Sequence, residues 1–207
     1  ILTHIGHSEK VFNMKRLLFI LILTLSFQSW TKADDIKDFE IEGMSIGDSL
    51  LDFFSLDEIK SFKSYFYNDK EYKALQTNLE PKNYDGIDVA VKDGDPDYTI
   101  YQIVGGIYYE ENIDNCYIKQ KKIVSELKNI FSNNVEKNSY TKKHASDITG
   151  KSSNTTTQFE FKSKDVVRVS CYDWGKEIED EKGYTDNLRV TIIEANFRNW
   201  VNTKAHK

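Results

Sequence analysis

Histidine and cysteine are scarce in this chain, which has four histidines and two cysteines among its 207 residues. From residue 34 onward the histidines are His144 and His206, and the cysteines, Cys116 and Cys171, are far apart in the sequence. Zinc and related metals are held by closely grouped residues of these types. The scarcity therefore argues against a metal centre, and the sequence predicts no cofactor.

The chain also lacks an apolar run long enough to span a bilayer, which takes about 20 residues. The apolar run at residues 17–27 is too short, but it follows a basic start and precedes small residues, an order typical of a secretory signal peptide. We therefore expect a signal peptide at residues 14–33, beginning at Met14, and untranslated upstream read-through at residues 1–13. No cysteine stands near the expected cleavage after Ala33, which argues against a lipid anchor. The protein is predicted to be periplasmic or secreted.

Clustered positive charge is missing as well. Removing residues 1–33 takes away four of the 28 basic and one of the 33 acidic residues, which leaves a net charge of −8. Nucleic acid backbones and anionic lipid headgroups both require clustered cations. The predicted partner is therefore a protein, a peptide or a small ligand, with no nucleic acid and, after signal cleavage, no membrane contact.

What the sequence does contain is an α+β pattern over residues 34–207, a length that forms a single domain with its own core. Alternating apolar residues and turn residues predict two hairpins and a last strand. The predicted strands are residues 87–91, 98–109, 158–161, 165–172 and 187–194. Gly105 and Gly106 predict a bulge or a close backbone approach late in the second strand.

Helical spacing and capping residues predict the helices. They are short helices at residues 48–54 and from Ser55 onward, a main helix at 113–131 and a terminal helix at 195–202. Residues 72–77 fit neither the helical nor the strand periodicity. The polar residues 132–156 indicate a surface loop, and residues 173–186 indicate an acidic loop. Because strands follow strands, we expect α+β architecture with an antiparallel sheet of about five to six strands and one main amphipathic helix packed on it.

The two cysteines fall on faces that could meet. Cys116 lies on the apolar face of the main helix, and Cys171 shares a strand face with Val167 and Val169. Cysteines of an exported chain most often pair, because compartments outside the cytoplasm are oxidising. We therefore expect a Cys116–Cys171 disulfide, with two buried thiols as the alternative.

Residues 47–50 spell GDSL, and the chain resembles the GDSL hydrolases at these four positions only. That resemblance implies Ser49 as a nucleophile, which would need a histidine as its base. The alternative is a helix start, in which Asp48 or Ser49 caps free N–H groups and Gly47 makes the turn.

The other blocks that such a hydrolase carries are missing from the sequence. The family's D-x-x-H block would need aspartate at Thr203 before His206, or at Thr141 before His144. Its oxyanion-hole block would need glycine at Phe66. We therefore interpret the GDSL match as a coincidence at a helix cap and predict no catalytic residue.

Two further patterns have an ordinary and a functional interpretation. Residues 93–97, DGDPD, look like a calcium loop, but Tyr98 and Val104 stand where an EF-hand needs glycine and glutamate, so a hairpin turn is favoured. Tyrosines and phenylalanines at residues 53–72 and 98–109 could form a stacking platform for sugars or peptides, or border the core. Trp174, beside the acidic loop, is the first surface aromatic to test.

The chain as a whole resembles a group of small exported bacterial proteins of unknown function. The matching stretches are FEIEGMSIGDSLLDFF with the following DEI, YTIYQIVGGIYYEENIDNCY, VVRVSCYDW and DNLRVTI. The resemblance implies export, the Cys116–Cys171 pair and a single α+β domain, and no catalytic or binding residue. Together these features favour a non-enzymatic binding or interaction module of the periplasm that uses its sheet or its acidic loop, with a Ser49 esterase as the alternative.

Overall fold

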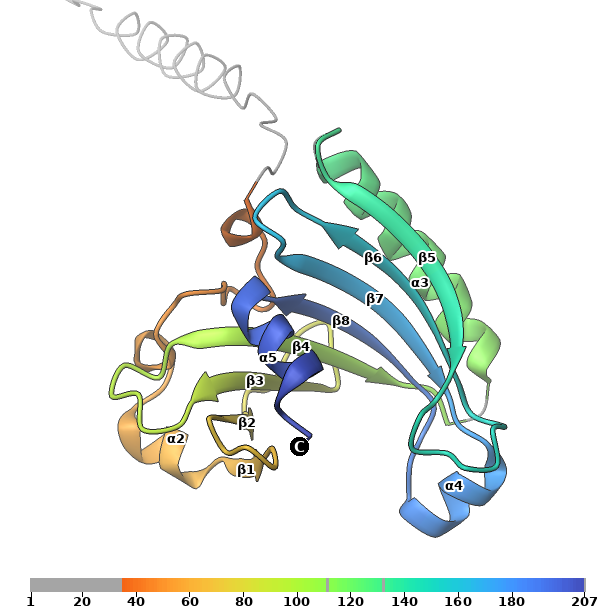
Figure 1. Ribbon diagram of the computed structural model, residues 1–207, viewed down its shortest axis with the longest axis horizontal. Coiled ribbons are helices and arrows are strands. Elements are labelled where there is room, and N and C mark those ends of the chain that lie inside the picture. Colours follow the sequence, from red (N-terminus) through yellow and green to blue (C-terminus); the bar gives the residue numbers. More distant parts are fainter. Residues whose placement is uncertain (1–34, 111, 132, 207) are drawn as a thin grey trace, which may run out of the picture. The chain divides into compact units, whose positions relative to one another are not determined.

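The computed structural model describes residues 35–110, 112–131 and 133–206, which are coloured in Figure 1. The predicted upstream segment, residues 1–13, and the predicted signal peptide, residues 14–33, lie outside these residues. The described residues belong to one compact unit, Ala33–Lys207. They form an eight-stranded sheet with the strand order β1-β2-β3-β4-β8-β7-β6-β5, in which all neighbours are antiparallel.

The α+β class and the antiparallel sheet are confirmed. The strands are β1 (Lys63–Phe66), β2 (Tyr72–Gln76), β3 (Gly86–Lys92), β4 (Ile100–Tyr108), β5 (Glu136–Lys143), β6 (Ser153–Glu160), β7 (Val166–Asp173) and β8 (Asn187–Ile193). The α-helices are α2 (Leu56–Ser61), α3 (Ile113–Ile130), α4 (Lys176–Lys182) and α5 (Ala195–Thr203), and the 3₁₀ helices are η1 (Ile36–Asp38) and η2 (Leu50–Asp52).

The predicted number of strands was wrong, because the described residues form eight strands and not five to six. β1 and β5 are the edge strands, and nearly all their side chains are exposed, so neither carries the apolar alternation that marks a strand. β5 and the first half of β6 occupy the predicted surface loop, and α4 occupies part of the predicted acidic loop. The edge strands β1 and β5 are held by pairing with a neighbour more than by burial of their own side chains.

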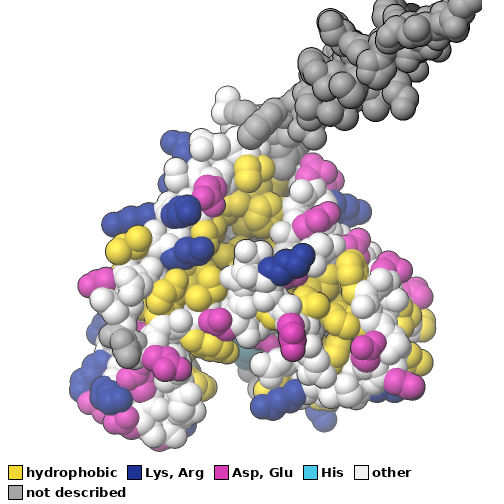
Figure 2. Space-filling model, turned by 180° about the vertical axis from the view of Figure 1, so that it is seen from behind, with side chains coloured by type: hydrophobic (Ala, Val, Ile, Leu, Met, Phe, Trp, Pro, Cys, Tyr) yellow, Lys and Arg dark blue, Asp and Glu magenta, His cyan; other side chains and the backbone are white. Residues whose placement is uncertain are grey.

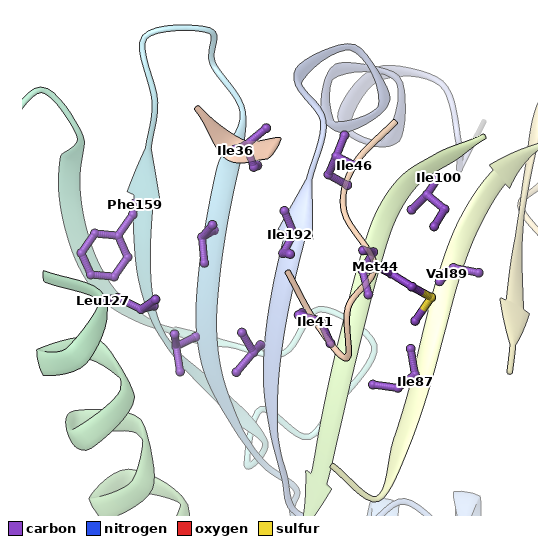
Figure 3. Packing of buried hydrophobic residues seen from close by; sticks show 14 of the residues in the cluster. Ile36, Ile41, Met44, Ile46, Ile87, Val89, Ile100, Leu127, Phe159 and Ile192 are labelled. Carbon is purple, nitrogen blue, oxygen red and sulfur yellow. The ribbon is translucent and has the colours of Figure 1, made fainter. Parts of the chain in front are cut away.

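One face of the sheet, here called the α3 face, carries the larger core (Figure 3). α3 packs on β7 and β8, where Leu127 lies near Phe159. The segment before η2 covers β3 and β4 with Ile41 and Met44, both buried. Burial of this apolar surface is the main source of stability.

The predicted disulfide joins α3 to the sheet. Cys116 and Cys171 are bonded, with their Cα atoms 6.0 Å apart, and both are fully buried. The bond closes a loop with a sequence separation of 55 residues. It fixes β7 against the helix that covers it.

The opposite face, here called the α5 face, is covered at one end by α5 (Figure 1). Phe197 and Trp200 of this helix pack on Tyr72, Ala90 and Ile193 in a second, smaller core. The rest of the α5 face carries polar side chains. Because side chains alternate along a strand, every second residue of β3, β4, β7 and β8 points to the α5 face, and those beyond α5 point into the uncovered region.

Candidate functional site

A groove of about 700 Å³ lies on the uncovered part of the α5 face. Its floor comes from β2, β3, β4, β7 and β8, with Tyr65 of β1 at one end and the segment around α4 at the other. Figure 2 shows the molecule from behind, on the α3 face, where its lower outline is notched between the part that carries α4 and the part that carries α2 and β1, while the groove itself opens on the other side. The groove is open to solvent and accessible to a ligand.

Two glycines leave the middle of the floor without side chains. Gly106 of β4 pairs with Gly86 of β3 on one side and with Arg189 of β8 on the other. A Cβ atom added at Gly86 would have no neighbour within 4 Å, and one added at Gly106 would meet only the Gly86 carbonyl oxygen, at 4.0 Å. The two glycines therefore add no side chain to the space between Asp88, Tyr108 and Arg189, which line the groove on the same face.

Arg189 stands beside this space in a fixed orientation. Its Nε atom donates to Asn187 Oδ1 at 3.0 Å, and its guanidinium carbon lies 4.5 Å from the centre of the Tyr172 ring. Asn187 is itself buried and donates to the Thr185 carbonyl at 2.7 Å. The guanidinium is thus held along one edge by the hydrogen bond to Asn187 and on one face by the cation–π contact with Tyr172.

The remaining edge of Arg189 is free to bind a ligand. Within the described residues, its two Nη atoms have no hydrogen-bond partner and the side chain forms no ion pair. This edge is the part of a guanidinium that binds a carboxylate or a phosphate through two parallel hydrogen bonds. An exposed arginine that is already oriented loses little conformational entropy when an anion binds.

Asp88 of β3 is the acidic group across the floor from Arg189. Asp88 lines the groove and is accessible to solvent, but partial desolvation by the surrounding residues raises the pKa of its carboxyl, while the charge of Arg189 lowers it. No ion pair joins the two among the described residues, so Asp88 does not neutralise Arg189 by direct contact. The groove therefore has a positive and a negative site facing each other.

Aromatic rings form the wall near α4. The Trp174 ring lies 4.4 Å from the ring of His144 and 4.7 Å from that of Tyr184, measured between centroids, and stacks on Tyr172 at 6.0 Å. Trp174 was predicted to be a surface aromatic, but it is only 9% exposed and shows one edge to the groove. Its backbone N–H donates to the Asp186 carboxylate at 2.7 Å, which fixes the wall.

Of the aromatic residues considered for a stacking platform, Tyr65 and Tyr108 line the groove and are about half exposed. Tyr184, which was not among them, lines the groove as well and is similarly exposed. Most of the other aromatic residues considered pack in the two cores or at their borders, as Phe62 and Tyr72 do. The half-exposed tyrosines are the ones available to a ligand.

His144 makes a contact that resembles a nucleophile–base pair. The hydroxyl of Ser146 lies 2.7 Å from His144 Nδ1. Burial and the charge of Arg189 lower the pKa of His144, while Asp147 opposes them, so the ring is a weaker base than usual. Asp147 accepts hydrogen bonds from the loop after it, and within the described residues no carboxylate bonds to His144. The pair lacks the third group that orients the base of a catalytic triad.

Ser49 has the role of a helix cap. Its side chain accepts a hydrogen bond from the Leu51 N–H at 3.2 Å and donates to the Asp97 carbonyl. It therefore caps η2, a 3₁₀ helix shorter than the helix predicted at residues 48–54. Among the described residues, no histidine is hydrogen-bonded to Ser49 as a base would be. His144 lies beside Trp174, and His206 lies beside Tyr67.

The DGDPD sequence at residues 93–97 forms the turn between β3 and β4, as favoured from the sequence. The carboxylate of Asp95 accepts hydrogen bonds from the N–H groups of Asp97 and Thr99, and Asp93 pairs with Lys73 at 2.9 Å. Its carboxylates thus stabilise the hairpin.

The residues that sequence reasoning missed are Arg189, Asn187 and Tyr172. The predicted strands at residues 165–172 and 187–194 already placed Asn187 and Arg189 on one face by alternation, and that polar face was the available signal. The pairing of β7 with β8, which brings Tyr172 under Arg189, depends on the strand order and was not available from the sequence.

The described part of the chain has neither a helix long and apolar enough to cross a membrane nor a group of residues suited to a metal ion. Comparison of the chain with protein-family models, with curated proteins and with solved structures found no match. The geometry of the groove is therefore the basis for assigning a function.

Proposed function

We propose that the protein is an exported, non-enzymatic binding module that holds a small organic anion in the groove of its α5 face. The observation that carries the proposal is the free edge of Arg189, which Asn187 and Tyr172 hold in place without an acidic partner. A carboxylate on the ligand would accept two hydrogen bonds from this edge, and charge-assisted bonds of this kind are the stronger class.

The surroundings of Arg189 support a ligand with an uncharged polar or ring-shaped body. Tyr108 and Tyr184 offer half-exposed rings, and Gln76 offers an amide group. The floor over Gly86 and Gly106 leaves room for the ligand. Sites of this size usually orient their ligand through a few polar groups of this type.

Export is part of the proposal and rests on two observations. The predicted signal peptide at residues 14–33 has the expected order of basic, apolar and small residues. The Cys116–Cys171 disulfide fits an oxidising compartment such as the periplasm. The resemblance to small exported bacterial proteins agrees with both.

The test uses the side-chain signals of arginine in a ¹⁵N-labelled protein that starts at residue 34, which carries only Arg168, Arg189 and Arg198. D-galacturonate is the charged probe and D-galactose the uncharged control, at constant ionic strength. We expect galacturonate to shift the Arg189 Nε resonance saturably, while Arg198, which is paired with Glu160 at 3.1 Å, stays in place. An Arg189 signal that does not move with the charged probe would rule the site out.

A substitution separates specific binding from general attraction. Arg189→Lys keeps the positive charge but removes the planar edge that binds two oxygens. Its affinity for galacturonate should fall about tenfold, which is the loss of one charge-assisted hydrogen bond. Equal affinity in the lysine variant would show that only net charge matters.

A further inference from the structure

The groove around Arg189 continues along the α5 face over β7, β6 and β5. A second hollow of about 200 Å³ shares His144 and Tyr172 with the first, and a third of about 670 Å³ shares Tyr140, Lys142 and Arg168 with the second. These strands lie side by side at this end of the sheet (Figure 1). Three adjoining open hollows, together called the channel here, therefore follow one another on this face and extend beyond the space that a small monoanion requires.

Arg168 repeats the arrangement of Arg189 in this extension. Its Nε atom donates to Gln158 Oε1 at 3.4 Å, and within the described residues it forms no ion pair. β7 and β8 pair Ser170 with Arg189, so Arg168 is the diagonal neighbour of Arg189 on the same face. Such neighbours have Cα atoms roughly 7–8 Å apart. Two unpaired arginines, each anchored through Nε to a side-chain amide, thus lie along one channel.

The channel between and beyond the arginines carries basic and polar side chains. Lys142 and Lys143 line it and, within the described residues, form no ion pair, whereas Lys164, which also lines it, is paired with Glu160 at 2.9 Å. The hydroxyls of Thr156 and Ser170 are buried and bonded to each other at 2.8 Å, so the accessible polar groups of this floor are the amides of Asn154 and Gln158. Hydroxyl and amide groups both donate and accept hydrogen bonds, which suits the hydroxyls of sugars better than apolar side chains.

From this arrangement we infer that the ligand is an acidic oligosaccharide, with one carboxylate on Arg189 and a second on Arg168. The inference rests on the proposed function and extends it from one anionic group to two. The hydroxyls of the sugar rings bind the accessible amide groups of the floor, those of Asn154 and Gln158, and half-exposed tyrosines such as Tyr108 contact ring faces. The open ends of the channel admit a chain longer than the site.

Two other extended ligands fit less well. A nucleic acid carries a charge on every nucleotide and would bring phosphates next to Asp88 and Glu110, which line the same groove. An extended peptide binds to the open edge of a sheet, whereas this channel crosses strand faces. A chain whose carboxylates are spaced by neutral hydroxyl-rich groups avoids both conflicts.

The test measures affinity by calorimetry for trigalacturonate, D-galacturonate and galactotriose, using the protein that starts at residue 34. Arg168→Gln should weaken trigalacturonate binding about tenfold and leave galacturonate binding unchanged, because the single carboxylate binds to Arg189. Lys121→Gln on α3 makes the same charge change on the opposite face and should alter neither affinity. Circular dichroism of each variant checks that it is folded.

The outcomes separate the two proposals. If galacturonate binds at Arg189 and trigalacturonate binds no tighter, or if Arg168→Gln has no effect on it, the oligosaccharide inference is wrong and the binding module stands. If neither ligand shifts Arg189, both fall. Binding of galactotriose equal to that of trigalacturonate, or tighter binding of an oligothymidylate of eight nucleotides, would also overturn the inference.

Discussion

Cys171 and Tyr172 are consecutive residues of β7 whose side chains serve opposite faces of the sheet. Cys171 is bonded to Cys116 of α3, and the Tyr172 ring lies under the guanidinium of Arg189, 4.5 Å from its carbon. The disulfide that fixes β7 against its helix therefore also fixes the ring that supports Arg189. The peptide bond between Cys171 and Tyr172 therefore connects the larger core to the groove.

Removing the disulfide should destabilise the protein strongly. The chain-entropy model gives about 4 kcal/mol for a loop of this length as an upper value, so the free energy of unfolding of Cys116→Ala/Cys171→Ala should fall by up to that amount. Urea unfolding of the variant and of the oxidised protein measures the difference. Intact mass without reductant should be lower by two hydrogens than after reduction, and two thiols that react with an alkylating agent in the unreduced protein would contradict the bond.

The pKa of Asp88 should respond to Arg189. Burial already raises it, and Arg189 is the group that lowers it, so Arg189→Gln should raise it further. A carboxylate with a raised pKa binds more protons in the folded state, so the free energy of unfolding should decrease more steeply in the variant as the pH rises through this pKa. Titration of the Asp88 carboxyl carbon by NMR measures the shift. Arg198→Gln, which removes the partner of Glu160, is the control and should leave Asp88 unchanged.

Gly105 and Gly106 should respond oppositely to the same substitution. At Gly106 a Cβ atom would enter open space in the groove, so Gly106→Val should fold normally and block galacturonate binding. At Gly105 the Cβ atom would lie 2.6 Å from the Tyr84 ring on the α3 face, so Gly105→Val should lose about 1–3 kcal/mol of stability through overpacking. Thermal unfolding and calorimetry of the two variants test the pair. A Gly106→Val protein that binds as well as the original would show that the ligand does not use this floor.

The elements with strong periodicity were predictable from the sequence, and the edges of the sheet were not. The apolar stripe of the main helix and the alternation of the hairpin at residues 87–109 match α3, β3 and β4 closely. β5 exposes nearly all its side chains, so its place depends on backbone pairing with β6. A strand that is held by backbone pairing and buries almost no side chain shows no apolar alternation in its sequence.

From the sequence we expected a binding surface on the sheet or the acidic loop, but not the residues that line the groove. The sheet and the acidic segment were both expected to bind a partner, and the groove lies between them. Net charge gave no indication of Arg189 and Arg168, because an acidic chain can still place its few arginines on one face when the strands that carry them pair, as β7 and β8 do. Asp88 and Arg189, about a hundred positions apart, face each other because β4 lies between β3 and β8.

Ser49 should behave as a structural residue. Ser49→Ala removes the cap of η2 and the bond to the Asp97 carbonyl, so the free energy of unfolding should fall by about 1 kcal/mol. Ser55→Ala, which removes the capping box of α2 with Glu58, is the matched control and should cost a similar amount. Urea unfolding measures both losses.

The same variants test the hydrolase alternative. With p-nitrophenyl butyrate as substrate, the original protein, Ser49→Ala and Ser146→Ala should all show the background rate of the buffer. A rate above background that disappears in Ser49→Ala would make the GDSL serine a nucleophile, and one that disappears in Ser146→Ala would assign that role to the Ser146–His144 pair. Either result would contradict a non-enzymatic module, since loss of a cap lowers stability and does not remove turnover from a folded protein.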